Sequence, residues 1–160
     1  MEITISACRT AWGWVGTVSS AQGLLGTTLP ATSREQALAP WLQRWPHAQE
    51  GLASHLATLH EKLQRYFRGE AVNFSTEALD TSQATEFQVR VWEVVRAIPC
   101  GQTHSYSWVA NQAGSPRGAR AVGRVMATNP LPIVVPCHRV VGQNGQLTGF
   151  GGGLDMKRRL

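Results

Sequence analysis

The feature that most constrains how this chain folds is a polar segment without helical or strand periodicity, TEALDTSQA at residues 76–84. It divides the chain into two halves. The total length of 160 residues suits one ordinary domain or two small ones that share a core. Short β-type runs dominate the half before the segment, and helical patterns dominate the half after it. We therefore expect an α+β protein with two domains, residues 1–80 and residues 81–160.

The first half begins with three short β-type runs, which are separated by glycine and serine: ITISA at 3–7, WGWVGTVSS at 12–20 and GLLGTTL at 23–29. Their spacing predicts a small antiparallel sheet. The next segment, SREQALAPWLQRW at 33–45, predicts a helix that Pro40 interrupts, because proline has no backbone N–H to donate.

Residues 51–67, GLASHLATLHEKLQRYF, have the clearest amphipathic pattern of the first half. The apolar residues that recur there at helical spacing are Leu52, Leu56, Leu59, Leu63 and Phe67. This spacing predicts a helix. The following AVNFST, at 71–76, favours a returning strand.

The second half opens with a predicted capping box. Thr85 and Gln88 form this pattern at the start of the apolar run FQVRVWEVVRAI, and Pro99 to Gly101 end the run. The side chains expected to face inward are those of Phe87, Val91, Val94, Val95 and Ile98.

Two shorter helical segments follow, joined by a tight turn. SYSWVANQA at 105–113 predicts a helix that Gly114 closes. Ser115 is expected to cap the next helix, with Pro116 at its first position. A helix, a tight turn and a second helix together predict a helix-turn-helix motif.

The second helix of this motif, RGARAVGRVMA at 117–127, is basic on one side. At helical spacing, one narrow sector holds Arg117, Arg120 and Arg124, and the opposite side holds Ala119, Val122 and Met126. Gly118 and Ala121 flank the arginine side, where their small size lets a partner approach the backbone closely.

The net charge of +5 is concentrated in the second half. Residues 1–80 contain six Lys and Arg against seven Asp and Glu, whereas residues 81–160 contain nine against three. No acidic residue lies between Glu93 and Asp155. This imbalance indicates a polyanionic partner, most commonly nucleic acid; by charge alone, a solvated basic surface is an equal alternative.

Other compositional features exclude several classes of protein. No run approaches the roughly 18 apolar residues of a membrane span, and the N-terminus, MEITISACRT, lacks the basic start of a secretory signal. The three cysteines, Cys8, Cys100 and Cys137, match no zinc or disulfide pattern. We expect a cytoplasmic protein with free thiols and no bound metal.

The motif with the most chemical content is IVVPCHRVVG at 133–142. The prolines expected to hold the approach to it extended are Pro130, Pro132 and Pro136. Ile133 to Val135 form a buried run, and Asn144-Gly145 predicts a hairpin turn. Farther on, the glycines at 149–153 let the backbone approach a ligand.

A buried thiol such as Cys137 is a weak nucleophile unless a base activates it. His138 is the adjacent base, and a bridging water suits two neighbouring side chains better than direct contact. Arg139 adds positive charge that favours a thiolate. From these residues alone, the alternative that Cys137 only packs and His138 only forms a hydrogen bond is the commoner one.

Four blocks of the second half resemble the O6-alkylguanine-DNA alkyltransferase family, also called methylated-DNA–protein-cysteine methyltransferases. The blocks are FQVRVWEVVRAIPCGQTHSYSWVA, SPRGARAVGRVMATNP, PIVVPCHRVVGQNG and LTGFGGGLDMKRRL. The resemblance is nearly continuous from about Thr85 to Leu160, and PCHRV with the upstream ARAVG and NP is a specific combination. The first half resembles the family only in its general style.

The resemblance implies a ribonuclease-H-like N-terminal domain, which packs against the site, and a winged-helix-like C-terminal domain that carries the alkyltransferase and DNA-binding site. It implies that the helix-turn-helix binds double-stranded DNA in the minor groove and that the O6-alkylguanine is flipped out of the base stack. Arg120 would fill the gap left by the base, and Tyr106 would press on the neighbouring phosphate and donate a proton to the departing guanine. The other residues expected to contact DNA are Arg117, Arg124, Ser115 and Ala121.

The resemblance also implies roles in the chemical step. Cys137 would attack the alkyl carbon, His138 would deprotonate it through water, and Asn129 would brace the cysteine loop. Val140 and the Cys137 backbone would read the guanine edge. The pocket residues implied are Met126, Pro132, Val140, Thr148, Phe150 and Gly151. Phe150-Gly151 stands where the family often has Tyr-Ser, so backbone N–H groups would replace a side-chain donor there.

The product implied is S-alkylcysteine, a thioether without a good leaving group, so the thiol would react once. No cofactor is needed, and we expect a monomer that acts on guanine and, as a further substrate, O4-alkylthymine. The final LDMKRRL predicts the opening of a helix. In the family this helix continues and supplies a glutamate to the histidine. Asp155 lies about five residues too early, more than one turn from the required position, so we expect a shortened chain.

Three other functions compete with this one. Non-catalytic relatives that only bind alkylated bases carry tryptophan at the cysteine position, and Cys137 argues against them. A helix-turn-helix transcription factor needs no PCHRV loop. A cysteine hydrolase normally takes its histidine from a distant segment, whereas His138 is adjacent to Cys137.

Overall fold

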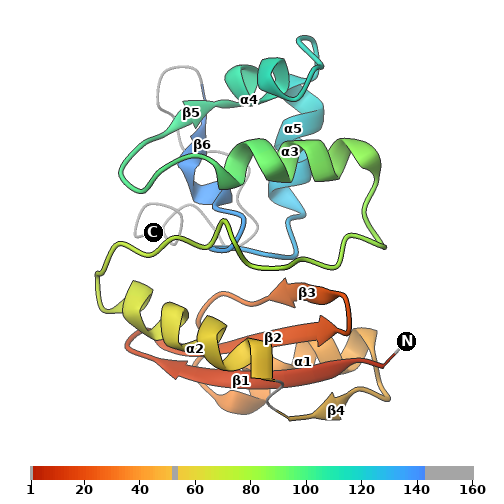
Figure 1. Cartoon of the computed structure of the whole chain (residues 1–160), viewed down its shortest axis with the longest axis vertical. Coiled ribbons are helices and arrows are strands. Elements are labelled where there is room, and N and C mark those ends of the chain that lie inside the picture. Colours follow the sequence, from red (N-terminus) through yellow and green to blue (C-terminus); the bar gives the residue numbers. More distant parts are fainter. Residues whose placement is uncertain (1, 52–53, 143–160) are drawn as a thin grey trace. The chain divides into compact units, whose positions relative to one another are not determined.

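The computed structural model describes residues 2–51 and 54–142, and the chain divides into two compact units, Met1–Asp80 and Thr81–Leu160 (Figure 1). We refer to them as unit 1 and unit 2. Within the described ranges, unit 1 combines a sheet with two helices, and unit 2 combines three helices with a short two-stranded sheet. The expected α+β class is confirmed.

The sheet of unit 1 has the strand order β3-β2-β1-β4. As predicted, β1 (Thr4–Thr10), β2 (Gly13–Ser20) and β3 (Gly23–Thr27) are antiparallel neighbours. The fourth strand, β4 (Gln49–Glu50), pairs parallel with β1 and was not predicted. Two exposed polar residues carry no alternation of apolar and polar side chains, so only the pairing itself identifies this strand.

Helix α1 (Arg34–Arg44) runs through Pro40 without a break, so the predicted interruption is wrong. The buried face of α1 carries Ala37, Leu38 and Trp41. Pro40 is exposed, and so is Gln36, whose carbonyl loses its helical partner at the proline. Water can satisfy that carbonyl, while packing of the opposite face holds the helix together.

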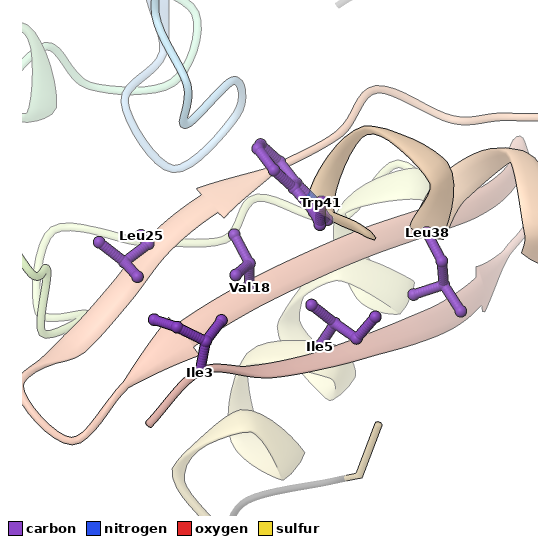
Figure 2. Packing of buried hydrophobic residues seen from close by; sticks show 6 residues of the cluster. All are labelled: Ile3, Ile5, Val18, Leu25, Leu38 and Trp41. Carbon is purple, nitrogen blue, oxygen red and sulfur yellow. The ribbon is translucent and has the colours of Figure 1, made fainter. Parts of the chain in front are cut away.

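The core of unit 1 lies between α1 and one face of the sheet. Figure 2 shows Ile3, Ile5, Val18, Leu25, Leu38 and Trp41 gathered there. Gly16 of β2 makes this packing possible, because a Cβ atom at Gly16 would lie 2.0 Å from the carbonyl oxygen of Ala37 in α1. The missing side chain therefore lets α1 lie close to the sheet.

Helix α2 (Ser54–Phe67) packs against β1. Leu56, Leu59, Leu63 and Phe67 are buried, as the amphipathic pattern predicted, and Leu52 lies outside the described residues. Cys8 points to the sheet face opposite Ile5, because side chains alternate along a strand. Its Sγ lies 3.6 Å from the carbonyl oxygen of His60 in α2.

No strand forms at residues 71–76, so that prediction is wrong. The Asn73 side chain accepts a hydrogen bond from the backbone N–H of Ser75 at 2.9 Å, which favours a turn over an extended strand. The chain meets the sheet a few residues later instead. Leu79 forms a parallel bridge with Leu24, and the Ser20 hydroxyl donates to the buried carboxylate of Asp80.

Unit 2 begins with α3 (Glu86–Arg96), and its predicted capping box is confirmed. The Thr85 side chain accepts from the Gln88 N–H at 3.1 Å, and the Gln88 side chain accepts from the Thr85 N–H at 2.8 Å. Val91, Val95 and Ile98 are buried, whereas Phe87 and Val94 are only half-buried. Trp92 is also buried, and the inward face proposed from periodicity had omitted it.

The helix-turn-helix segment consists of α4 (Tyr106–Gln112) and α5 (Ala119–Ala127), which contact each other. The prediction that Ser115 caps α5 is wrong, because Gly118 occupies the N-cap position without a side-chain cap. Residues from Ser115 to Gly118 form a turn instead, closed by a 2.8 Å bond from the Gly118 N–H to the Ser115 carbonyl. The helix can begin only after this turn.

A parallel pair of two-residue strands completes unit 2. The strand β5 (His104–Ser105) leads directly into α4, and β6 (Val140–Val141) lies beside it, with His104 opposite Val140. In residues 2–51 and 54–142, no helix combines the length and the apolar character needed to cross a membrane.

Candidate active site

Cys137 begins a single 3-10 turn, η1 (Cys137–Arg139), which β6 follows directly. Its side chain is buried with 3% of the residue exposed, and His138 is buried with 7% exposed. The Arg139 N–H donates to the Pro136 carbonyl at 2.9 Å and closes the turn. The turn therefore holds the thiol and the imidazole at adjacent buried positions.

Asn129 holds the loop that leads to this turn. Its Nδ2 donates to the carbonyl of Val135 at 2.9 Å, and its Oδ1 accepts from the N–H of Leu131 at 3.0 Å. The same Val135 carbonyl accepts from the Cys137 N–H at 2.7 Å. One amide side chain thus fixes both ends of the segment before the cysteine, a geometry that supports the bracing role predicted for Asn129.

The approach to the cysteine is a compact turn, not the extended segment predicted from its prolines. The Val135 N–H donates to the Leu131 carbonyl at 2.8 Å, and Ile133 between them adopts φ 75°. A β-branched residue in the left-handed region stores backbone strain of roughly 1–3 kcal/mol. Ile133 is only 2% exposed, so burial of its side chain and the Asn129 hydrogen bonds together hold this conformation.

Arg139 anchors the turn to α3. Its Nη1 donates to the carbonyl of Ile98, just beyond the end of α3, at 2.8 Å. From the sequence, Arg139 was expected to act through its positive charge on the thiol. In the structure, one end of the guanidinium forms a hydrogen bond with a carbonyl 41 positions earlier in the chain. No local sequence pattern indicates this contact.

Tyr106 stands where one of the two short strands passes into α4. It is the first residue of α4 and half-buried, and it follows β5, which is paired with β6 immediately after η1. Ser105 caps α4 by accepting from the Trp108 N–H at 3.0 Å. The strand pairing therefore ties the start of α4 to the end of the cysteine turn.

The three arginines predicted on one side are exposed, but only Arg120 and Arg124 belong to α5. Arg117 lies in the turn before the helix, so its predicted helical position is wrong. The buried side of α5 carries Val122, Val125 and Met126, whereas Ala119 is only half-buried. Ala121 and Ser115, the other residues proposed to contact DNA, are half-buried. Unit 2 thus presents three cations from one turn and helix.

The proposed pocket is only partly described. Met126, Pro132 and Val140 are buried in unit 2, next to or within the elements that hold Cys137. Thr148, Phe150 and Gly151 lie outside the described residues, as do the predicted Asn144-Gly145 hairpin and the predicted C-terminal helix. In the described part of the chain, no group of three or more His, Cys, Asp or Glu residues is arranged to hold a metal ion.

The other two cysteines have different surroundings. Cys8 is buried in β1, where burial raises the pKa of its thiol to about 11, so it stays protonated and unreactive at neutral pH. Cys100 is exposed in the turn after α3. Neither stands beside a histidine in the sequence, as Cys137 does.

Comparison with known proteins relates this chain to DNA methyltransferases. A family model described as "6-O-methylguanine DNA methyltransferase, DNA binding domain" matches residues 86–160. A Mycolicibacterium paratuberculosis protein named "Methylated-DNA--protein-cysteine methyltransferase" is 53% identical over 100 residues, which cover 62% of this chain and 59% of that protein. The match therefore spans less than two thirds of that relative's length.

Solved structures match over almost the whole chain. The crystal structure of Mycobacterium tuberculosis O6-methylguanine methyltransferase is 34% identical with a TM-score of 0.78, and the match covers 99% of this chain and 90% of that one. The crystal structure of Mycobacterium tuberculosis OGT in complex with DNA is 35% identical with a TM-score of 0.76, covering 97% and 88%. With a relative of this identity matched over nine tenths of its length, the chain belongs to the O6-methylguanine methyltransferase family.

Proposed function

We propose that this chain repairs DNA by direct reversal, moving an alkyl group from O6 of guanine to its own Cys137. The observation that carries the proposal is the placement of Cys137: a buried thiol in a turn that Asn129 and Arg139 hold from two sides. The relatives named above support it, because one is a methylated-DNA–protein-cysteine methyltransferase and another was crystallised with DNA.

Binding begins with the exposed arginines of α5 and of the turn before it. Arg117 and Arg124 contact phosphates, and the helix-turn-helix enters the minor groove. The alkylated base rotates out of the stack, a step that costs a few kcal/mol in a duplex. Arg120 occupies the space it leaves, and Ser115 and Ala121 lie against the DNA backbone. The buried Met126, Pro132 and Val140 line the pocket for the base, together with Thr148, Phe150 and Gly151.

The chemical step is a displacement at the alkyl carbon. His138 takes the Cys137 proton through a water molecule, and the thiolate sulfur forms a bond to the alkyl carbon as the bond from that carbon to O6 breaks. The electron pair of the broken bond stays on the guanine oxygen, and the base regains a proton supplied by the Tyr106 hydroxyl. The products are unmodified guanine and S-alkylcysteine.

The reaction is stoichiometric. The thioether formed at Cys137 has no good leaving group, so each molecule acts once and needs no cofactor. We further propose that the protein acts as a monomer in the cytoplasm. In this proposal, unit 1 is a ribonuclease-H-like domain and unit 2 a winged-helix-like domain, with the roles divided between residues 1–80 and 81–160 as the sequence predicts.

The intact mass of the protein tests the proposal after it is mixed with a duplex that contains one O6-methylguanine. We expect a gain of one methylene, located on the peptide that contains Cys137, and an equal amount of repaired guanine in the DNA. Cys100→Ser serves as the matched control and should gain the same mass. An unchanged wild-type mass, with the duplex still bound, would leave a protein that only binds DNA.

A further inference from the structure

His104 and Trp108 form a stacked aromatic pair where β5 passes into α4. Their ring centroids are 3.6 Å apart, and the ring planes differ by 15°. Both side chains are half-buried. His104 immediately precedes the N-cap residue Ser105, and Trp108 is the third residue of the helix. In the hydrophobic staple, a contact between the residue before the N-cap and the fourth helical residue fixes the angle at which the chain enters the helix. The His104–Trp108 stack makes a comparable contact with the third helical residue.

The start of α3 shows what this pair replaces. There the third helical residue, Gln88, returns a hydrogen bond to the backbone of Thr85 and completes the capping box. In α4 the cap is one-sided: Ser105 accepts from the Trp108 N–H at 3.0 Å, but an indole has no acceptor with which to return the bond. Stacking of Trp108 on His104 supplies the second constraint at this helix start.

Core packing does not account for Trp108. The buried residues of α4 are Val109 and Ala110, with Ala113 at its C-cap. At about 100° per residue, Trp108 lies on the side of the helix away from them. The indole ring of Trp108 instead stacks on His104, which precedes the helix. This contact stabilises the junction of β5 and α4.

We infer that the His104–Trp108 stack is a positioning pair for Tyr106, a role that rests on the function proposed above for that tyrosine. Tyr106 is the first residue of the helix and lies midway in the sequence between His104 and Trp108. On one side, β5 is in register with β6 directly after the Cys137 turn. The entry angle of α4 therefore decides where the Tyr106 hydroxyl lies relative to Cys137.

Three variants separate positioning from general stability. Trp108→Gln removes the stack but places a glutamine three residues after Ser105, which builds a capping box like that of α3 and keeps the helix start stable. His104→Ala removes the stack while keeping Trp108. His104→Phe keeps a flat ring and should preserve the stack. We expect about tenfold slower methyl transfer from duplex DNA for the first two variants, and a rate near wild type for His104→Phe.

A double-mutant cycle with Tyr106→Phe provides the decisive readout. If the stack acts through the tyrosine hydroxyl, Trp108→Gln should cause little further loss once that hydroxyl is removed. A merely structural effect of Trp108→Gln would instead multiply with the effect of Tyr106→Phe. Multiplicative losses, or a slow His104→Phe variant, would overturn the inference.

A second measurement does not depend on activity. The chain has two tyrosines, Tyr66 and Tyr106, so fluorotyrosine labelling gives two fluorine resonances, and Tyr66→Phe assigns them. Trp108→Gln and His104→Ala should shift or broaden the Tyr106 resonance, whereas His104→Phe should not. If the wild-type chain transfers no methyl group, the proposed function fails; an unmoved Tyr106 resonance in both stack-breaking variants would overturn the positioning role itself.

Discussion

Cys8 in unit 1 and Cys137 in unit 2 are equally buried, each with 3% of the residue exposed, yet their surroundings differ completely. Cys8 lies in the middle of a regular strand, and its thiol faces the carbonyl of His60. Cys137 begins a 3-10 turn, after a strained residue and between two anchored segments. Burial alone therefore does not distinguish an inert thiol from a candidate nucleophile; the backbone that carries it does.

The sharpest test of this comparison removes each thiol in turn. Cys137→Ala should abolish methyl transfer and keep DNA binding, because no other thiol stands in the anchored turn. Cys8→Ala should transfer at the wild-type rate and lose only about 1 kcal/mol of unfolding free energy, as expected for a small deletion in a core. Intact mass and thermal unfolding measure the two effects. Methylation of the Cys137→Ala variant would refute the assignment.

The next largest effect is expected at Arg120. Arg120→Ala should slow transfer from duplex DNA by roughly tenfold to a hundredfold, because base flipping costs a few kcal/mol, and should leave the reaction with the free alkylated base unchanged. Arg9 is an exposed arginine of unit 1, so Arg9→Ala is the control and should affect neither substrate. Equal slowing on both substrates would move Arg120 from DNA binding to the pocket or the fold.

Asn129 tests whether anchoring of the loop matters. Asn129→Ala leaves the Leu131 N–H without its acceptor, at a cost of roughly 1–3 kcal/mol, and the Val135 carbonyl keeps only the Cys137 N–H of its two donors. Transfer should slow on duplex and free base alike, since the thiol itself is displaced. Asn129→Asp keeps the acceptor only and should be intermediate. Wild-type rates for Asn129→Ala would show that the turn stands without this clamp.

Variants of Arg139 distinguish the effect of its positive charge from the effect of its hydrogen-bond geometry. If its bond to the Ile98 carbonyl is what matters, Arg139→Lys, which keeps the charge on a head group of different shape, should lose as much activity as Arg139→Gln, which carries no charge. We expect losses of about threefold to tenfold for both variants, in line with one hydrogen bond of roughly 1 kcal/mol. A Lys variant that is clearly faster than the Gln variant would restore the electrostatic role.

The smallest effect is the pH dependence of unit 1. Burial lowers the pKa of His60 from 6.5, so below pH 6.5 the unfolded chain binds a proton that the folded chain resists, and stability falls as the pH falls. Burial raises the pKa of Cys8 from 9.0 to about 11, so between these values the unfolded thiol ionises first, and stability falls as the pH rises. Thermal unfolding should therefore be most resistant between about pH 6.5 and 9.0.

Two variants isolate these slopes. His60→Gln should flatten the acidic side and Cys8→Ala the alkaline side, each by a few degrees in melting temperature. Unit 2 provides the contrast, since Cys100→Ser should alter neither slope. If the acidic slope of stability against pH persists unchanged in His60→Gln, groups other than His60 cause it.

Local patterns predicted most elements but not all of their ends. The alternating strands, the amphipathic α2 and the Thr85–Gln88 capping box are confirmed, because each depends on side chains within a few residues of one another. The predicted helix break at Pro40 and the predicted helix cap at Ser115 are wrong. Packing of α1 on the sheet overrides the proline, and a turn closed by Gly118 delays the start of α5.

The sequence by itself determined which reactive and charged residues the candidate site can use: a cysteine beside a histidine, an asparagine before the loop, and arginines at helical spacing in a region without acids. Only the tertiary structure decided how the thiol is held. Two contacts join residues that are far apart in the chain: the Arg139 hydrogen bond to the Ile98 carbonyl and the pairing of His104 with Val140. The left-handed conformation of Ile133 depends on the residues that surround it. Local propensity contains no information on such contacts, because their free energy exists only once the chain has folded around them.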